Sequence, residues 1–562
     1  MKTLLSIVLS GEAGQGLATI EDFLVKTISN LYYVFSTNEV MSRVRGGNNS
    51  VEFRVSNTPV YGYQSTIDVL FLLNDHSLYR LKSRLKSDTM VFGDPKFLTE
   101  DDTKLLGDRF IPLSVETLAS ESGSVLFSNV VLFGFVAGML TLKEDFATDL
   151  IQEKFGNKKA NILEGNLKAF TSGFAQGTAY AHIHNLETQA TSHLRIMSGT
   201  EAIGIGSLAG GCNFIASYPM SPATGLLIYL SGKSNDFGVF VEQAEDEIAA
   251  INMTIGAWYA GARAIATTSG GGFALMEEGI SLSGITETPC VTHIAQRPGP
   301  GTGLPTRTAQ EDLNLAVYAG HGEFARAIYA PGNMEDAIRL TQKAFYVADK
   351  YQVPTFILSD QYLLDSNFQL EPFELDDTCL TSFVVKSDAD YKRYALTEDG
   401  VSPRAIPGYG DGLVKCDSDE HYEDGTLTED FDVRIAQNGK RLHRKELLLE
   451  DYEAPELFGP VDYDTLIVGW GSTYGILKEY VEDHNPGKTA YLYIKQPFPL
   501  APSVKSYFDQ ASTIIDVESN GTGQFANVLK LELDVTVTHK FLKFDGVPLS
   551  IEDIVTYMKE EL

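Results

Sequence analysis

The stretch from 290 to 303 reads Cys290-Val291-Thr292-His293-Ile294-Ala295-Gln296-Arg297-Pro298-Gly299-Pro300-Gly301-Thr302-Gly303. Its first half is apolar and typical of a buried strand, and its second half is a loop shaped by proline and glycine. The loop holds Arg297 at a strand end, where open α/β sheets bind ligands, and a guanidinium suits a bidentate grip on a carboxylate. The alternative interpretation is an ordinary ion pair in a surface loop.

A second candidate loop lies upstream and follows an expected strand at 214–217. It reads Tyr218-Pro219-Met220-Ser221-Pro222-Ala223-Thr224-Gly225. Two prolines stiffen the turn and expose the hydroxyls of Ser221 and Thr224. Rigid turns with hydroxyls are common, so this turn alone is only a candidate site.

A third candidate follows the expected strand at 238–241, where Glu245, Asp246 and Glu247 lead into a helix rich in small residues at 248–262. Acidic residues in a first helical turn usually just complement the helix dipole. Glu247 differs because it directly adjoins the apolar helix, which favours burial of its carboxyl group. The three loops would then share one edge of a parallel sheet.

The whole chain repeats this alternation of strands and helices, so the expected fold class is α/β, with three doubly wound domains. A chain of 562 residues is also too long for a single core. We expect domains at 1–190, 191–375 and 456–562. The charged, turn-rich segment 376–455 is expected to be a connecting arm that is ordered against its neighbours.

Composition excludes several classes of function. The chain has 75 acidic and 44 basic residues and a formal charge of -31, which argues against binding to nucleic acid or anionic lipid. Its four cysteines, Cys212, Cys290, Cys379 and Cys416, lack the spacing of a zinc or iron–sulfur site and fit a reducing cytoplasm. The longest apolar run, 129–142, is shorter than the ~18–20 residues of a membrane span, so no membrane segment is expected.

The N-terminal region carries a glycine-rich turn, Gly11-Glu12-Ala13-Gly14-Gln15-Gly16, between an expected strand at 4–9 and a helix. Gly14 and Gly16 suit the approach of a phosphate to backbone N–H groups at a helix N-terminus, and Glu39 lies roughly where a ribose-binding acid would. A nicotinamide or flavin site, a purely structural turn, and a site for another phosphate-bearing ligand or a partner all remain open.

A loop at 39–50 places Arg43 and Arg45 beside a pair of glycines. This arrangement suits an anionic ligand or a contact between subunits. A solvated loop is a comparable alternative.

Together these motifs resemble the fused gamma–alpha subunit of the 2-oxoacid:ferredoxin oxidoreductases. The resemblance covers nearly the whole chain, and the order and spacing of the motifs at 218–222, 245–252 and 296–306 are highly specific. The motifs at 11–16 and 42–47 correspond to the gamma part. The resemblance implies a gamma-type domain, a pyrimidine-binding domain for thiamine diphosphate and a transketolase C-terminal-like domain.

The resemblance also implies roles for particular residues. Glu247 would hydrogen-bond N1′ of the aminopyrimidine, Arg297 would clamp the substrate carboxylate, and the Ser221 hydroxyl would bond near the keto group. In this sequence serine stands where threonine is usual and Met220 replaces a branched aliphatic residue, but the hydroxyl is kept. The remaining residues predicted to bind substrate or cofactor are Thr224, Tyr218, Pro219, Gly14, Gly16, Arg43 and Arg45.

The implied reaction is oxidative decarboxylation of a 2-oxoacid, such as 2-oxoglutarate, to acyl-CoA and carbon dioxide, with ferredoxin or flavodoxin as acceptor. Thiamine diphosphate would be shared with a smaller beta subunit, which would hold Mg²⁺ and a [4Fe-4S] cluster, in a dimer of heterodimers. We expect no metal ligands in this chain, because Gly410-Asp411-Gly412 with Asn438 matches the magnesium–diphosphate motif only by spacing. The rival hypotheses are a nicotinamide- or flavin-linked dehydrogenase and a non-catalytic scaffold subunit.

Overall fold

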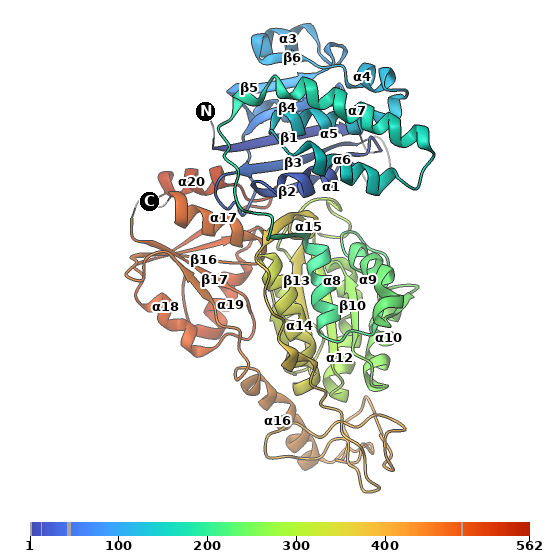
Figure 1. The fold of residues 1–562 in the computed structure, drawn as a ribbon. Coiled ribbons are helices and arrows are strands. Elements are labelled where there is room, and N and C mark those ends of the chain that lie inside the picture. Colours follow the sequence, from blue (N-terminus) through green and yellow to red (C-terminus); the bar gives the residue numbers. More distant parts are fainter. Residues whose placement is uncertain (1–2, 13, 42–46, 485–486, 562) are drawn as a thin grey trace. The chain divides into compact units, whose positions relative to one another are not determined.

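The computed structural model describes residues 3–12, 14–41, 47–484 and 487–561. The chain forms two compact units (Figure 1). The first comprises Met1–Met197, Asp365–Phe373 and Ser550–Leu562, and the second comprises Ser198–Leu364 and Glu374–Leu549. The chain therefore returns twice to the first unit, and the domain boundaries expected from the sequence stay a prediction.

The first unit contains an eight-stranded sheet of order β6-β5-β4-β1-β3-β2-β14-β7. Its strands are β1 Leu4–Glu12, β2 Tyr33–Glu39, β3 Asn48–Ser56, β4 Ile67–Leu72, β5 Leu85–Gly93, β6 Phe110–Pro112, β7 Arg195–Ser198 and β14 Asn367–Leu370. Strand β3 runs antiparallel to both β1 and β2. The sequence did not predict β3, because charged Glu52 and Arg54 interrupt its apolar run. Glu52 is buried in an ion pair with Arg84, and Arg54 donates to the carbonyl oxygen of Gly62.

Helices cover this sheet: α1 Leu17–Ile28, α2 His76–Leu81, α3 Glu100–Leu106, α4 Val115–Glu121, α5 Ser128–Met139, α6 Glu144–Phe155, α7 Ala160–Thr178 and α20 Ile551–Glu560. The apolar run at 129–142 is the buried helix α5. A Cβ on Gly134 would lie 2.2 Å from the carbonyl oxygen of Phe170, so the glycine lets α5 and α7 approach closely. In the described residues no single helix has the length and hydropathy to cross a membrane. One pair of helical segments, α4 and 125–139, reaches that length and hydropathy only when the two are taken together, and the chain bends by 119° between them.

The second unit contains two sheets. A fully parallel six-stranded sheet has the order β12-β13-β11-β10-β8-β9, and a five-stranded sheet has the order β15-β17-β16-β18-β19. Their strands are β8 Phe214–Ser217, β9 Phe240–Gln243, β10 Ala264–Thr268, β11 Cys290–Gln296, β12 Ala327–Tyr329, β13 Pro354–Asp360, β15 Glu456–Phe458, β16 Thr465–Trp470, β17 Thr489–Ile494, β18 Thr513–Glu518 and β19 His539–Leu542. The α/β class expected from the sequence is confirmed.

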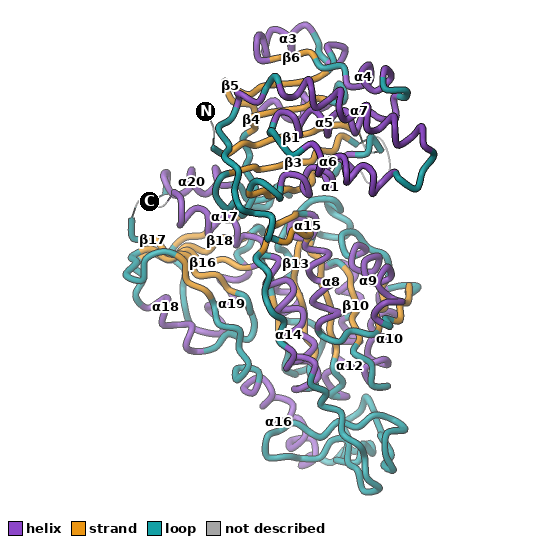
Figure 2. Tube along the Cα trace, in the orientation of Figure 1, coloured by secondary structure: helices purple, strands orange, loops and turns teal. Residues whose placement is uncertain are grey.

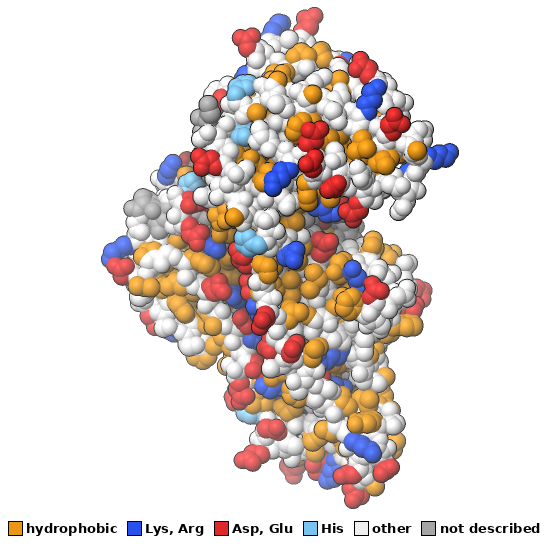
Figure 3. All heavy atoms as spheres, viewed as in Figure 1, with side chains coloured by type: hydrophobic (Ala, Val, Ile, Leu, Met, Phe, Trp, Pro, Cys, Tyr) orange, Lys and Arg blue, Asp and Glu red, His pale blue; other side chains and the backbone are white. Residues whose placement is uncertain are grey.

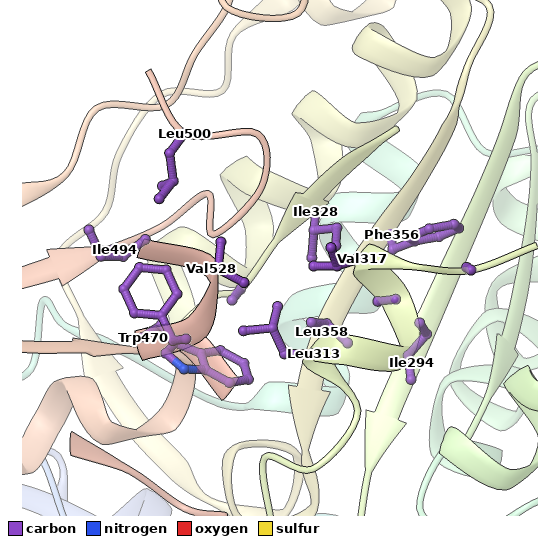
Figure 4. Packing of buried hydrophobic residues seen from close by; sticks show 14 of the residues in the cluster. Ile294, Leu313, Val317, Ile328, Phe356, Leu358, Trp470, Ile494, Leu500 and Val528 are labelled. Carbon is purple, nitrogen blue, oxygen red and sulfur yellow. The ribbon is translucent and has the colours of Figure 1, made fainter. Parts of the chain in front are cut away.

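One hydrophobic core joins these two sheets. Ile294 and Leu358 of the six-stranded sheet belong to the same buried cluster as Trp470 and Ile494 of the five-stranded sheet (Figure 4). The helices of this unit are α8 Gly199–Ala209, α9 Thr224–Phe237, α10 Glu247–Tyr259, α11 Gly270–Leu275, α12 Glu277–Thr286, α13 Leu313–Val317, α14 Met334–Tyr351, α15 Gln361–Asp365, α16 Phe431–Leu447, α17 Tyr474–Glu479, α18 Lys505–Asp509 and α19 Gln524–Leu533. The core shared with the five-stranded sheet holds the six-stranded sheet from the side of β12 and β13.

The segment 376–455 is mostly loop, with α16 as its main regular element (Figure 2). It packs onto Glu287, which follows α12 and is fully buried. The carboxylate of Glu287 forms ion pairs with Arg444 and, at 3.0 Å, with Lys440. Burial opposes this charge, but the cations of Arg444, Lys440 and Arg393 outweigh burial and lower the pKa of Glu287 to about 2. The ion cluster fastens the arm to the second unit.

Substitution Glu287→Gln should lower the free energy of unfolding by about 3–5 kcal/mol, because it leaves buried cations without their counter-charge. Urea unfolding of the purified chain measures this loss. Glu335→Gln is the matched control, because Glu335 pairs with Arg339 on the surface of α14 and such pairs contribute at most ~1 kcal/mol. Equal losses in the two variants would show that the cluster does not fasten the arm.

Candidate active site

The carboxyl ends of β8, β9, β10 and β11 lie at one edge of the parallel sheet, because these strands are neighbours and run in the same direction. Each strand is followed there by a loop that carries polar side chains. The three loops singled out from the sequence follow β8, β9 and β11. Ligands bind at this edge in open α/β sheets.

Arg297 lies directly after β11 and reaches back to the turn after β8. Its Nη1 donates to the carbonyl oxygen of Ser221 at 2.6 Å, and its Nη2 donates to Sδ of Met220 at 3.4 Å. The side chain is buried, yet among the described residues no carboxylate forms an ion pair with it. The remaining N–H groups of the guanidinium are therefore available to an anionic ligand.

The turn at 218–225 brings its predicted residues next to Arg297. The Ser221 hydroxyl oxygen is buried and has no hydrogen-bond partner in the described structure. The backbone N–H of Thr224 donates to the carbonyl oxygen of Met220 at 3.0 Å, which closes the turn at the start of α9. Tyr218 is exposed and Pro219 is half-buried, and both directly follow β8. Ser221 and Arg297 are thus together, as their proposed shared substrate requires.

The two acidic residues at the start of α10, Asp246 and Glu247, have different roles. Asp246 caps the helix, because its Oδ1 accepts a hydrogen bond from the backbone N–H of Ala249 at 2.7 Å. Glu247 instead turns inward and is only 3% exposed. Its Oε1 is buried without a partner among the described residues. A buried carboxylate oxygen without a donor is costly, so this atom is suited to receive one from a ligand.

A fourth segment at this edge, not among those predicted from the sequence, follows β10 and comprises Ser269 and the first turn of α11 with Gly270, Gly271 and Gly272. A Cβ on Gly272 would lie 2.0 Å from Oγ1 of Thr268 and 2.5 Å from Oε1 of Glu247. Gly272 therefore makes the room that Glu247 occupies. Three consecutive glycines after a strand are the signal that could have identified this segment by the rule applied to the other three.

The N-terminal glycine turn lies in the first unit, far along the chain from these loops. Gly14 and Gly16 adopt positive φ angles of 93° and 74°, and α1 begins at Leu17 without a side-chain cap. A cavity of about 240 Å³ adjoins the turn and is lined by Gly14 and Gln15 among others. The carboxylate of Glu39 is engaged by Arg80. Arg43 and Arg45 lie outside the described residues.

The described residues contain no group of three or more His, Cys, Asp or Glu side chains placed to hold a metal ion. Gly410 forms an isolated bridge with Ser387 inside the arm, and Asn438 lies on α16. Neither follows a strand in the manner of a magnesium–diphosphate motif. Cys212, Cys290 and Cys379 are buried thiols and Cys416 is exposed.

Comparisons with known proteins agree with this geometry. The family described as pyruvate flavodoxin/ferredoxin oxidoreductase, thiamine diphosphate-binding, matches residues 205–440, and pyruvate ferredoxin/flavodoxin oxidoreductase matches residues 6–176. The 2-oxoacid:ferredoxin oxidoreductase subunit alpha of Sulfolobus sp is 28% identical over 98% of this chain and 96% of that protein. The 2-oxoglutarate oxidoreductase subunit KorA of Mycobacterium tuberculosis is 28% identical over 79% of this chain and 70% of that protein.

A solved structure is also similar over its full length. The 2-oxoglutarate:ferredoxin oxidoreductase from Magnetococcus marinus, with 2-oxoglutarate, coenzyme A and succinyl-CoA bound, matches with a TM-score of 0.92 and 29% identity, and the match covers 100% of both chains. The resemblance inferred from the motifs is therefore confirmed. This chain belongs to the family of 2-oxoacid:ferredoxin oxidoreductase alpha subunits.

Proposed function

We propose that this chain is the alpha subunit of an enzyme that oxidatively decarboxylates a 2-oxoacid, such as 2-oxoglutarate, to acyl-CoA and carbon dioxide. The observation that carries the proposal is that two groups at the same sheet edge both lack a partner. Glu247 presents a buried oxygen without a donor, and Arg297 presents a buried guanidinium without a carboxylate. A cofactor ring nitrogen and a substrate carboxylate are the groups that would complete them.

Glu247 is suited to hold a proton at N1′ of an aminopyrimidine. Thiamine diphosphate, when bound, supplies the electron sink that decarboxylation requires. The Asp246 cap fixes the start of α10, and Gly272 leaves space for the Glu247 carboxylate, so its Oε1 is aimed before the cofactor arrives. Preorganisation of this kind is what lets a carboxylate act in proton transfer.

Arg297 and Ser221 are suited to the substrate. The free N–H groups of Arg297 would bind the carboxylate, and the unpartnered hydroxyl of Ser221 would donate to the keto oxygen. Thr224, Tyr218 and Pro219 would shape the same turn around the substrate and the pyrimidine. Because Arg297 also donates to the Ser221 carbonyl oxygen, the two substrate contacts are held at a fixed separation.

We propose that the beta subunit covers the face formed by α10, α11 and α12. Ile248, Met253 and Leu275 expose 49%, 40% and 51% of their surface there, and a cavity of about 590 Å³ is lined by Ile248, Leu275 and Phe324. Ile248 follows Glu247 directly, so a chain that covers Ile248 also closes over Glu247. This partner would hold the diphosphate, Mg²⁺ and a [4Fe-4S] cluster, in a cytoplasmic dimer of heterodimers that reduces ferredoxin or flavodoxin.

Coenzyme A is the proposed ligand of the first unit. The cavity beside Gly14 and Gly16 is lined mainly by apolar side chains, with the amides of Gln15 and Asn129 and the charged side chains of Asp94, Lys96 and Glu116. This lining suits an amide-containing chain such as pantetheine. Arg43 and Arg45 are the proposed contacts for its phosphates.

Substitution Glu247→Gln should reduce 2-oxoacid-dependent viologen reduction by about 100-fold or more, because proton transfer to the cofactor is lost. The variant is assayed in the complex with its beta subunit, and gel filtration checks that the complex still assembles. Glu245→Gln is the control, because Glu245 is exposed two residues earlier, in the loop that precedes α10. Retention of more than a few per cent of activity would count strongly against the role of Glu247.

Substitution Gly272→Ala should abolish most activity without unfolding the chain, because the new methyl group displaces the Glu247 carboxylate and the Thr268 hydroxyl. Gly271→Ala is the matched control, since a Cβ on Gly271 would meet only the carbonyl oxygen of Gly301, at 3.7 Å. The assay is again viologen reduction by the complex, with circular dichroism as the check on folding. Equal activities of the two variants would show that Glu247 needs no such space.

Substitution Arg297→Ala should chiefly raise the KM for the 2-oxoacid. Loss of a charge-assisted hydrogen bond costs about 1.5–3 kcal/mol, which corresponds to roughly a ten- to hundred-fold change. Arg297→Lys should show a smaller increase, because it keeps the charge and loses the bidentate geometry. Steady-state kinetics over a range of substrate concentrations measure both. An unchanged KM in Arg297→Ala would remove Arg297 from the substrate site.

A further inference from the structure

Asp312 lies at the same sheet edge as Arg297 and has no part in the reaction described above. Its carboxyl group packs flat against Gly270, where an added Cβ would lie 2.1 Å from Oδ1 and 2.3 Å from Oδ2. Oδ2 is buried without a partner in the described structure, as is the neighbouring hydroxyl of Ser269. The backbone N–H of Asp312 donates to Oε1 of Gln296 at 3.0 Å, which ties it to the residue before Arg297.

The charged groups that act on Asp312 are few. Glu311 precedes it and accepts a hydrogen bond from the backbone N–H of Gly299 at 2.7 Å. Arg297 is the cation that acts on it, although the two side chains form no ion pair. The sequences of α11 and α13 contain no titratable side chain.

Among the other elements packed nearby, α10 brings Glu247 against Gly272 of α11, where an added Cβ would lie 2.5 Å from its Oε1. On β11, His293 is bonded to Thr267 and Ser359, and burial lowers its pKa to about 3, so it stays neutral. On α19, Lys530 pairs with Asp534 and Glu532 pairs with Lys445. The charge state of Asp312 is therefore set by burial, by Glu311 and by Arg297.

We propose that Asp312 is a positioning residue that controls the grip of Arg297 on the substrate carboxylate. In its acid form Asp312 leaves the guanidinium to the substrate, and in its ionised form it competes for the same guanidinium. The inference rests on the proposed function, because it takes the substrate to be a carboxylate bound by Arg297. Substrate binding and protonation of Asp312 then favour each other, as linked equilibria must.

The direction of the pH dependence follows from the surroundings of Asp312. Burial and the charge of Glu311 raise the pKa of this carboxyl group, Arg297 opposes them, and the result is a pKa of about 7. Asp312 is therefore neutral below this pH and ionised above it. The KM of the wild-type complex for its 2-oxoacid should be low near pH 6.5 and rise roughly three- to ten-fold by pH 8.5.

Asp312→Asn is the decisive variant, because asparagine keeps the size of the side chain and cannot ionise. Its KM should stay at the low value across this pH range, with kcat at pH 6.5 unchanged. Asp509→Asn, which makes the same change on an exposed position, should retain the wild-type rise. A KM of Asp312→Asn that is raised at every pH, or a wild-type KM that does not vary, would overturn the proposal.

A binding measurement tests the inference without turnover. The probe is a 2-hydroxyacid, which keeps the carboxylate and lacks the reactive ketone, titrated into the complex by calorimetry at pH 7.5. In buffers of different ionisation enthalpy, the wild type should take up a proton on binding and Asp312→Asn should take up none. Absence of proton uptake by the wild type would refute the role of Asp312 even if the variant fails to fold. A wild-type complex without 2-oxoacid-dependent dye reduction at any pH would refute the proposed function instead.

Discussion

A buried carboxylate oxygen that no protein group satisfies is the constraint on which the candidate site depends. Leaving Oε1 of Glu247 without a donor costs free energy in the isolated chain. The fold nevertheless keeps it there, since Asp246 takes over the capping of α10 and Gly272 leaves the space free. A ligand that supplies an N–H group recovers this cost on binding. The instability of the empty arrangement is therefore a source of affinity for a protonated ring nitrogen.

The position of Glu247 depends on both ends of α10. At the C-terminal end of this helix, Arg404 of the arm donates to the carbonyl oxygen of Trp258 at 3.2 Å, and the Tyr259 hydroxyl donates to the carbonyl oxygen of Val414 at 2.8 Å. The arm is itself fastened by the ion cluster around Glu287. These two bonds tie the arm to the C-terminal end of α10, so the arm helps to hold in place the helix whose other end carries Glu247.

The sequence predicted those parts of the site that depend on local pattern. The strand at 214–217 has the same bounds in the structure, and Ser221 and Arg297 follow β8 and β11, the two strands that flank β10 in the parallel sheet. Glu247 was distinguishable from Asp246 because it adjoins an apolar helix. Asp312 was not recognisable, because its burial depends on contact with Gly270 at the start of α11, which is distant in the sequence. The return of α20 to the first unit likewise depends on tertiary contacts, such as that of Glu552 with Thr66.

The chain as a whole is negatively charged, whereas Arg297 in the candidate site is positive. The negative charges are spread over the surface, where salt screens them. A formal charge of -31 repels an anionic substrate, but acidic and basic side chains are interspersed on the face shown in Figure 3, and salt screens exposed charges beyond about 8 Å at physiological ionic strength. The guanidinium of Arg297 is buried and escapes most of this screening. In the proposed site, binding of a 2-oxoacid therefore depends mainly on the buried charges that act on Arg297. Asp312 is the carboxyl group that acts on Arg297, so in the proposed scheme its protonation matters more than the screened carboxylates of the surface.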